Sequence, residues 1–285
     1  MGTEGPFDTL DLLILGAVSG ELEALRGWFE TVEQRLTPWA PVWLGFMGRL
    51  RLGLACLGIG KVNAAAGSAI LVDRFRPAMI WIVGSAGAYR ESPLRVGDVL
   101  VSTTVVLGDE GVWERDGKPS MQAIGYAVAE EKGRHVYERF DLSEDPAIKH
   151  LSDITPAGLY FVSSTPVGIP RLHPYAMETF KEAVHAGSNP DVFHVAFGPS
   201  VTVGMSSGDE WIAGERFVRY GAWAEDMEGS AVVQVCRRYD VPVVQCRGIS
   251  NQAGVRDKRS WRMEEALAHC HAVVGTWLHK MLTAP

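Results

Sequence analysis

Apolar runs of strand length alternate with amphipathic stretches along most of the chain. Each run stops at glycine or polar residues, which is typical of strands buried in a sheet. The predicted strands cover residues 11–18, 49–60, 77–87, 96–111 and 241–250. The predicted helices cover the stretch with Leu22, Leu25, Trp28 and Phe29 on one face, and residues 61–75, 208–221, 226–240 and 263–282. Strands that alternate with helices indicate an α/β domain.

The middle of the chain lacks this alternation. Residues 113–160 are rich in charge and poor in long apolar runs, so their pattern predicts no definite elements. The sequence contains no internal repeat, no low-complexity segment and no linker long enough to divide it. We therefore expect a single domain over residues 1–285, with an elaboration at about residues 113–199.

Composition narrows the class of protein. Hydrophobic residues make up 47% and charged residues 21% of the chain, as in ordinary globular proteins. A net charge of −7 leaves no basic surface to follow a phosphate backbone, so we expect no nucleic-acid partner. The first apolar run, LDLLILGAV, is too short to span a membrane and follows Asp8 instead of a basic segment. We therefore expect neither a membrane anchor nor a signal peptide.

The spacing of cysteines and histidines indicates no metal site. Cys56, Cys236, Cys246 and Cys270 form no C-x-x-C pair, and the histidines form no H-x-x-x-H cluster. The glycine turn at residues 84–89 matches neither a dinucleotide-binding nor a nucleotide-phosphate motif, so no cofactor is expected. The cysteines lie in apolar or helical surroundings, which favours buried thiols in a reducing cytoplasm.

Polar residues gather at the predicted strand ends, where α/β sheets bind ligands. The four strand ends are Gly16–Glu21, Gly84–Gly87, Ser206–Trp211 and Ser250–Asn251. Glu21 and Glu228 fit either an acidic first turn of a helix or a functional carboxylate, and a carboxylate can accept both hydroxyls of a ribose diol. Asn251 fits either a turn or an amide that pairs with a 6-oxopurine.

The order of the motifs is more specific than any one of them. The chain contains, in sequence, GA-x3-E, GIGKVNAA, GSAG, VGDV, SGDEWI, DMEGSAV and RGISN. This order resembles the nucleoside phosphorylase/nucleosidase superfamily, and within it the hydrolytic methylthioadenosine/S-adenosylhomocysteine nucleosidases and futalosine hydrolases. The resemblance covers about residues 10–111 and 200–280. It implies a three-layer α/β/α fold with a central mixed twisted sheet, cleavage of a purine nucleoside, and a homodimer or larger homo-oligomer.

The resemblance also assigns roles to residues. It implies that Glu21 activates the attacking water, that Glu228 binds the ribose diol, and that Trp211 packs on the purine. The catalytic residues that it implies are Glu21 and Asn251. The substrate-binding residues that it implies are Ser85, Ala86, Gly87, Trp211, Ile212, Met227, Glu228 and Ser250.

Asn251 departs from the pattern of the methylthioadenosine nucleosidases, which have an aspartate that protonates N7 of adenine. An amide cannot deliver a proton, and its donor face suits a 6-oxo group. The stretch ISNQAGVRD with Trp261 after it, and LGDEGVWERDG, resemble futalosine hydrolases, which release hypoxanthine from futalosine and leave dehypoxanthine futalosine, in menaquinone biosynthesis. Two alternatives stay open: another purine nucleosidase or phosphorylase, and a purine-binding module without turnover.

Two further features concern anions. Phosphorylases of the superfamily carry arginines in the first loop and before the Gly-Ser turn, whereas this chain has AVSGEL and Ile82, so hydrolysis is expected. The benzoate of futalosine needs a cation or donors. The candidates are Arg90, Lys118, Arg171, His173 and Arg256, each of which equally fits a solvated surface charge.

Overall fold

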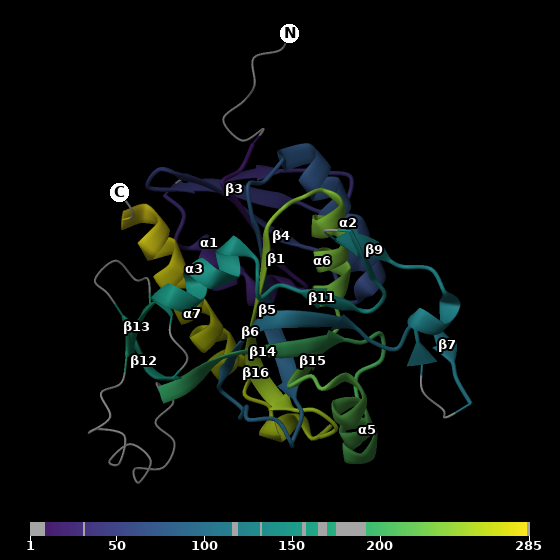
Figure 1. Cartoon of the computed structure of the whole chain (residues 1–285). Coiled ribbons are helices and arrows are strands. Elements are labelled where there is room, and N and C mark those ends of the chain that lie inside the picture. Colours follow the sequence, from purple (N-terminus) through teal and green to yellow (C-terminus); the bar gives the residue numbers. More distant parts are fainter. Residues whose placement is uncertain are drawn as a thin grey trace.

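A computed structural model describes residues 9–30, 32–115, 119–131, 133–155, 158–164, 170–174 and 192–283 of the chain. Its centre is a mixed sheet with helices on both faces (Figure 1). The strands run in the order β13 (Pro170–Pro174), β12 (Gly158–Ser164), β14 (Val192–Thr202), β6 (Val99–Leu107), β16 (Val243–Gln252), β5 (Ile80–Ala88), β1 (Leu12–Gly16), β4 (Leu50–Cys56), β3 (Val42–Met47) and β2 (Val32–Arg35). Two short strands, β11 (Arg139–Asp141) and β15 (Ala224–Asp226), pair beside this path.

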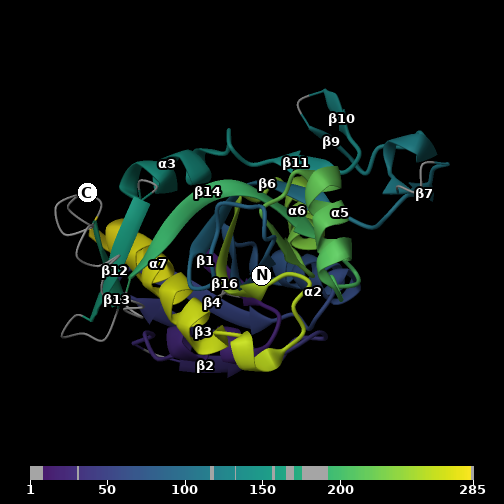
Figure 2. The same cartoon turned by 90° about the horizontal axis from the view of Figure 1, so that it is seen from below.

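The helices form two layers around the sheet. On one face, α2 (Lys61–Phe75) packs beside α6 (Gly229–Arg238), and on the other α7 (Met263–Thr283) packs on β16 with α3 (Pro146–Ile154) against it (Figures 1 and 2). The remaining helices are α1 (Glu23–Arg26) and α5 (Glu210–Tyr220). Single 3-10 turns cover Ser19–Glu21, Gln122–Ile124 and Lys258–Ser260. The predicted three-layer α/β/α fold with a mixed central sheet is confirmed.

The buried strands form as the apolar pattern predicts. All five residues of β1 are buried, because helices cover both faces of the sheet there. The core extends from β5 to α7 through Trp81 and Trp277, whose rings meet edge to face at 5.4 Å. The helix α2 has the same bounds as its predicted range.

Some predicted elements differ from the structure. The helix predicted after Glu21 contains only four residues, because Gly27 caps it, and the chain then forms the hairpin β2–β3, which the pattern did not predict. The helix predicted over residues 226–240 begins at Gly229, since residues 224–226 form β15. Cys236, Cys246 and Cys270 are buried as expected, whereas Cys56 is half-buried.

The charged middle of the chain forms small hairpins and sheet strands. One hairpin pairs β7 (Val112–Trp113) with β8 (Pro119–Ser120), and a second pairs β9 (Ala129–Glu131) with β10 (Arg134–Val136). The β9–β10 hairpin packs against α6, and β7 lies at the outer edge of the molecule in Figures 1 and 2. Within the described ranges, none of the helices combines the length and the apolarity that a membrane crossing requires.

Three neighbouring strands position the candidate site residues. The strand β5 lies between β1 and β16 and runs parallel to both. The carboxyl ends of the three strands therefore meet at one edge of the sheet, where α/β proteins bind ligands. The residues that follow these ends include Glu21 after β1, while Ser85 and Asn251 lie in the last residues of β5 and β16.

Candidate active site

Glu21 is a buried carboxylate held by backbone donors. It follows β1 in the turn Ser19–Glu21, and only 5% of its surface is exposed. Its Oε2 accepts hydrogen bonds from the backbone N–H of Ala17 at 2.7 Å and of Val18 at 3.3 Å, and its Oε1 accepts one from Ser85 N–H at 3.0 Å. The hydrogen bond from Ser85 links the carboxylate, which follows the end of β1, to the end of the neighbouring strand β5.

Arg247 is a fully buried cation in β16, 1% exposed, which the sequence interpretation missed. Its Nη2 lies 3.5 Å from Glu228 Oε2 and 3.6 Å from Asp226 Oδ1. Burial lowers the pKa of Arg247, but Asp226, Glu228 and Glu21 outweigh burial, so the pKa lies above its ordinary value. A lone arginine inside the apolar run VPVVQCRGIS was the available signal, because a buried charge needs partners.

Gly84 explains why Glu21 and Arg247 can approach one another. A Cβ atom at this position would collide with Glu21 Oε1 and would lie 2.7 Å from Arg247 Nη1. The glutamate and the guanidinium therefore converge over the backbone of Gly84 in β5. The GSAG segment, predicted as a turn, lies within β5, and its first glycine leaves the space in which these two side chains meet.

Glu228 lies immediately before α6 and is 6% exposed. Its Oε1 accepts a hydrogen bond from Gly60 N–H at 3.0 Å, at the start of α2. Burial raises the pKa of Glu228, Asp226 raises it further, and Arg247 opposes the rise. The site thus contains a carboxyl group that takes up a proton more readily than an ordinary glutamate.

The acidic neighbours of Glu228 are committed to structural contacts. Asp226 Oδ1 accepts hydrogen bonds from the backbone N–H of Glu228 at 2.9 Å and of Gly229, the first residue of α6, at 2.7 Å. Glu225 accepts hydrogen bonds from Tyr89 Oη at 3.0 Å and from Ser207. Of the acids in AEDMEG, Glu228 is therefore the one that joins the start of α2 to Arg247.

Asn251 lies at the end of β16, opposite Gly87 of β5 and just past a β-bulge. Its Oδ1 accepts a hydrogen bond from Ser250 Oγ at 2.8 Å, and its Nδ2 donates one to the carbonyl of Gln252 at 3.0 Å. A Cβ at Gly87 would lie only 3.3 Å from Nδ2, so glycine leaves room for the amide. Ser250 is buried and Ala86, whose carbonyl lies 3.3 Å from Ser250 Oγ, is also buried. Asn251 itself is half-buried.

Trp211 and Ile212 lie apart from the buried carboxylates. They begin α5, which Asp209 caps, and Trp211 is 74% exposed whereas Ile212 is half-buried. The turn after Asn251 touches this helix start, because a Cβ at Gly254 would lie 2.6 Å from the carbonyl oxygen of Asp209. The structure thus brings the segment with Trp211 next to the segment with Asn251.

Met227 is half-buried, directly before Glu228, and its Sδ accepts a hydrogen bond from Ser206 Oγ at 3.4 Å. Ser206 belongs to the loop between β14 and α5. The structure therefore brings the residues predicted from five separate motifs to one edge of the sheet, with Trp211 as the most exposed of them.

The cations proposed for a substrate carboxylate have other surroundings where the structure describes them. Arg90 is exposed and pairs with Glu210 at 3.3 Å, and the guanidinium of Arg256 lies 5.2 Å from the centre of the Trp261 ring. Lys118 lies outside the described residues, as do the side chains of Arg171 and His173 in β13. Among the described residues, no group of three or more histidine, cysteine or acidic side chains is placed to hold a metal ion.

The charge balance of the site is negative. Glu21, Asp226 and Glu228 surround the single guanidinium of Arg247. Because these groups are buried, their interactions with a bound molecule are stronger than they would be in water. Such a site favours a ligand that develops positive charge over one that brings negative charge.

Comparison with known families identifies the superfamily of the chain. Residues 11–278 match the model of the family described as the phosphorylase superfamily. The chain belongs to this superfamily. The match includes every predicted site residue from Glu21 to Asn251.

Relatives in the superfamily are nucleosidases. The chain is 30% identical over 247 residues to the 5′-methylthioadenosine/S-adenosylhomocysteine nucleosidase of Listeria monocytogenes serovar 1/2a. The aligned region covers 84% of this chain and 85% of the relative. It is 28% identical over 269 residues to the nucleosidase of the same name from Geobacillus thermodenitrificans. This aligned region covers 92% of this chain and 93% of the relative.

Solved structures of the superfamily share the fold. The nucleosidase of Neisseria meningitidis in complex with methylthio-immucillin-A superposes with a TM-score of 0.69 at 23% identity, over 94% of this chain and 97% of that chain. The nucleosidase of Colwellia psychrerythraea in complex with adenine superposes with a TM-score of 0.71 at 21% identity, over 96% of each chain. These likenesses support the three-layer fold described above.

Proposed function

We propose that the chain hydrolyses the N-glycosidic bond of a 6-oxopurine nucleoside, with futalosine as the substrate and hypoxanthine as the released base. One observation carries the proposal: the amide of Asn251 lies opposite Gly87 of β5, three residues beyond Gly84, over which Glu21 and Arg247 pack, and Arg247 in turn pairs with Glu228. The nucleosidase relatives support the reaction class, because their names describe enzymes that act on purine nucleosides.

In this mechanism Glu21 is the general base. Its carboxylate is held by the N–H groups of Ala17 and Ser85, so it cannot turn away from a water molecule beside C1′. Deprotonation of the attacking water by a positioned carboxylate is typically worth about 10²–10⁴-fold in rate. Glu228 accepts hydrogen bonds from the ribose diol and fixes the sugar at the carboxyl end of β5.

The surrounding charge supports hydrolysis over phosphorolysis. Cleavage of an N-glycosidic bond builds positive charge on the sugar, which the excess of carboxylates around Arg247 stabilises. Phosphate would enter the same site as an anion. Arg247 would have to leave Asp226 and Glu228 to bind phosphate, so water is the better nucleophile.

Asn251 supplies the preference for a 6-oxopurine. Ser250 donates to its Oδ1, which leaves Nδ2 as the donor side of the amide. An amide nitrogen carries two hydrogens, so Nδ2 can donate to N7 or O6 of the base while it keeps its bond to Gln252. N7 accepts in adenine as well, so the preference comes from position 6: adenine presents an amino group where hypoxanthine has O6, and two facing donors would both lose a partner.

The first test is base release from futalosine, inosine and methylthioadenosine, with and without phosphate. We expect hypoxanthine from futalosine at a rate that phosphate does not change. Release from methylthioadenosine alone would favour the second candidate, a methylthioadenosine-type nucleosidase, which the names of the relatives support. Release from none of the three would indicate a purine-binding module, against the proposal.

The second test exchanges the amide for an acid. Asn251→Asp should move the ratio of adenine to hypoxanthine release toward adenine, because the new carboxyl can donate to N7 and accept from the 6-amino group. The control Asn251→Leu has a similar size and no donor, so we expect hypoxanthine release to fall on the order of 10²-fold without any gain in adenine release. An unchanged ratio in Asn251→Asp would rule out this role for Asn251.

The proposal includes a homodimer or larger homo-oligomer in which the whole chain acts as one nucleosidase domain. Three large apolar side chains near the start of α2 support it: Ile59, Val62 and Met205 are 57%, 83% and 73% exposed. Exposed apolar groups of this kind are typical of protein interfaces. Light scattering on the purified protein would measure the mass, and a monomer at assay concentration would contradict this part.

A further inference from the structure

A buried histidine contacts the main chain of Glu21 from the far end of the sequence. His271 lies in α7, is 5% exposed, and its Nε2 is 2.8 Å from the carbonyl oxygen of Glu21. A carbonyl oxygen only accepts hydrogen bonds, so Nε2 carries the hydrogen. The bond joins α7 to the turn Ser19–Glu21 that presents the carboxylate.

The surroundings of His271 keep this bond in place. Burial lowers the pKa of the imidazole, against the opposing effect of Glu21, so the ring is neutral at neutral pH. The ring of Trp28 lies edge-on at 6.4 Å between centres and limits rotation of the imidazole. A neutral ring with its hydrogen on Nε2 is therefore a constant donor to Glu21.

The segment that carries Glu21 has little regular structure of its own. It consists of one 3-10 turn, and the first hydrogen bond of α1 runs from Arg26 N–H to the carbonyl of Leu22, one residue after Glu21. The helical ladder therefore begins too late to include the Glu21 carbonyl. His271 supplies a donor to that carbonyl, while Ala17 and Ser85 supply donors to the carboxylate of the same residue.

We propose that His271 is a positioning residue for Glu21, which fixes the main chain of the turn so that the carboxylate stays aligned with the attacking water. This inference rests on the proposed function, in which Glu21 is the base. Without the bond the turn is free to shift, and a displacement of about 1 Å at a reacting group can lower a rate on the order of 10²-fold. Binding of the nucleoside depends on Glu228 and Asn251, so KM should change little.

The chain offers a matched control in His269, two residues earlier in α7. His269 is 2% exposed, its Nδ1 lies 2.6 Å from the carbonyl of Gly97, and its ring stacks on Phe193 at 4.1 Å. Both histidines are buried, and both bind a carbonyl oxygen. Of these two histidines, only His271 binds the turn that carries Glu21. Comparing variants of the two residues therefore distinguishes a general loss of packing from a displacement of Glu21.

The experiment compares four full-length variants by kcat, KM and thermal unfolding in the base-release assay. His271→Leu removes the donor, and we expect kcat to fall about 10–100-fold with KM within about twofold of the wild type. His271→Gln places an amide N–H near the position of Nε2 and should restore kcat to within about threefold. His271→Asn is too short to do so and should resemble His271→Leu. His269→Leu should lower the unfolding temperature but leave kcat within about twofold.

Three outcomes would overturn the inference: wild-type kcat in His271→Leu, equal kcat loss in His269→Leu, or no recovery in His271→Gln. If His271→Leu does not fold, the ratio of kcat between His271→Gln and His271→Asn decides, and a ratio near one counts against the inference. A wild type that releases no base would instead refute the proposed function, and this inference with it. Base release by a wild type whose His271 variants are equally active would refute the inference alone.

Discussion

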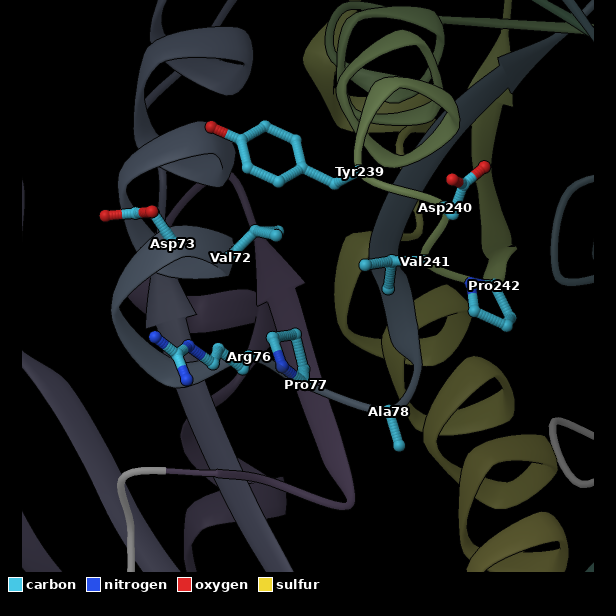
Figure 3. Close-up of a pocket in the computed structure, with 9 residues that line it drawn as sticks. All are labelled: Val72, Asp73, Arg76, Pro77, Ala78, Tyr239, Asp240, Val241 and Pro242. Atoms are coloured by element: carbon cyan, nitrogen blue, oxygen red, sulfur yellow. The ribbon is translucent and has the colours of Figure 1, made fainter. Parts of the chain in front are cut away.

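The charged side chains at the two ends of the parallel strands β5 and β16 differ in burial. At the amino ends, the last turn of α2, the loop after it and the loop after α6 line a cavity of about 410 Å³. Figure 3 shows Arg76 and Pro77 on one side of this cavity and Tyr239 and Asp240 on the other. At the carboxyl ends, Glu21 and Arg247 are packed over Gly84.

The difference shows which feature identifies a site in this molecule. The charged residues beside the cavity, Asp73, Arg76 and Asp240, are exposed, so water and salt screen them. The carboxyl groups at the opposite end are 5–6% exposed and share one buried guanidinium. Buried charge is expensive unless it is paired, and it acts strongly on anything that binds beside it. The cavity at the amino ends is lined by exposed charges, whereas the proposed chemistry uses the buried charges at the carboxyl ends.

We expect the largest difference in kcat between the two ends when one carboxylate at each end is exchanged for an amide. Glu21→Gln should lower kcat by about 10²–10⁴-fold, because an amide cannot take the proton of the attacking water. Asp73→Asn makes the same chemical change beside the cavity and should leave kcat within twofold. Steady-state base release from the wild type and both variants measures this. Comparable losses in both variants, or full activity in Glu21→Gln, would remove the functional distinction between the two ends.

Much of the fold follows from local pattern. The helix α2 was predicted with its observed bounds, since residues 61–75 combine helix-forming and small residues between a glycine and a proline. The hairpin β2–β3 was missed because β2 is exposed along most of its length and has no alternation of apolar residues to read. Short exposed strands depend on the strands beside them for stability, and a local sequence pattern gives no information about those neighbours.

The candidate site was predicted where a motif contains its residues, and it was missed where its residues are linked only by tertiary contacts. Glu21, Glu228 and Asn251 follow from the order of motifs, and the structure brings their segments to one edge of the sheet. Arg247 left a signal, a lone charge in an apolar strand. His271 left none, because its partner is 250 positions away and both α7 and the turn of Glu21 look ordinary in sequence.

The buried end should also respond to pH in a way that the exposed end does not. Burial, together with Asp226, raises the pKa of Glu228, and only the ionised form accepts both hydroxyls of a ribose diol. We therefore expect kcat/KM to fall as pH is lowered through the pKa of Glu228, above the ordinary value of 4.5 for glutamate. Arg247 opposes this rise, so its removal should move the acidic limb to higher pH.

Arg247→Gln tests this expectation, with Arg247→Lys as the control that keeps the positive charge. The profile of kcat/KM against pH should shift upward in Arg247→Gln and stay closer to the wild type in Arg247→Lys. Circular dichroism at each pH verifies that both variants remain folded. An acidic limb at the same pH in all three proteins would mean that Glu228 does not control it.

The smallest effect concerns the exposed end, where backbone conformation matters more than charge. Arg76 caps α2 in the left-handed region at φ 40°, a conformation that is strained for residues with a Cβ. Arg76→Gly should relieve this strain and raise the free energy of unfolding by about 0.5–1 kcal/mol, after the greater freedom of glycine in the unfolded chain is subtracted. Asp240 has φ 54°, but aspartate tolerates this region better, so Asp240→Gly should gain less. Urea unfolding measures both, and kcat should not change in either variant. A loss of stability in Arg76→Gly would show that the arginine side chain contributes more at the cavity than its exposure indicates.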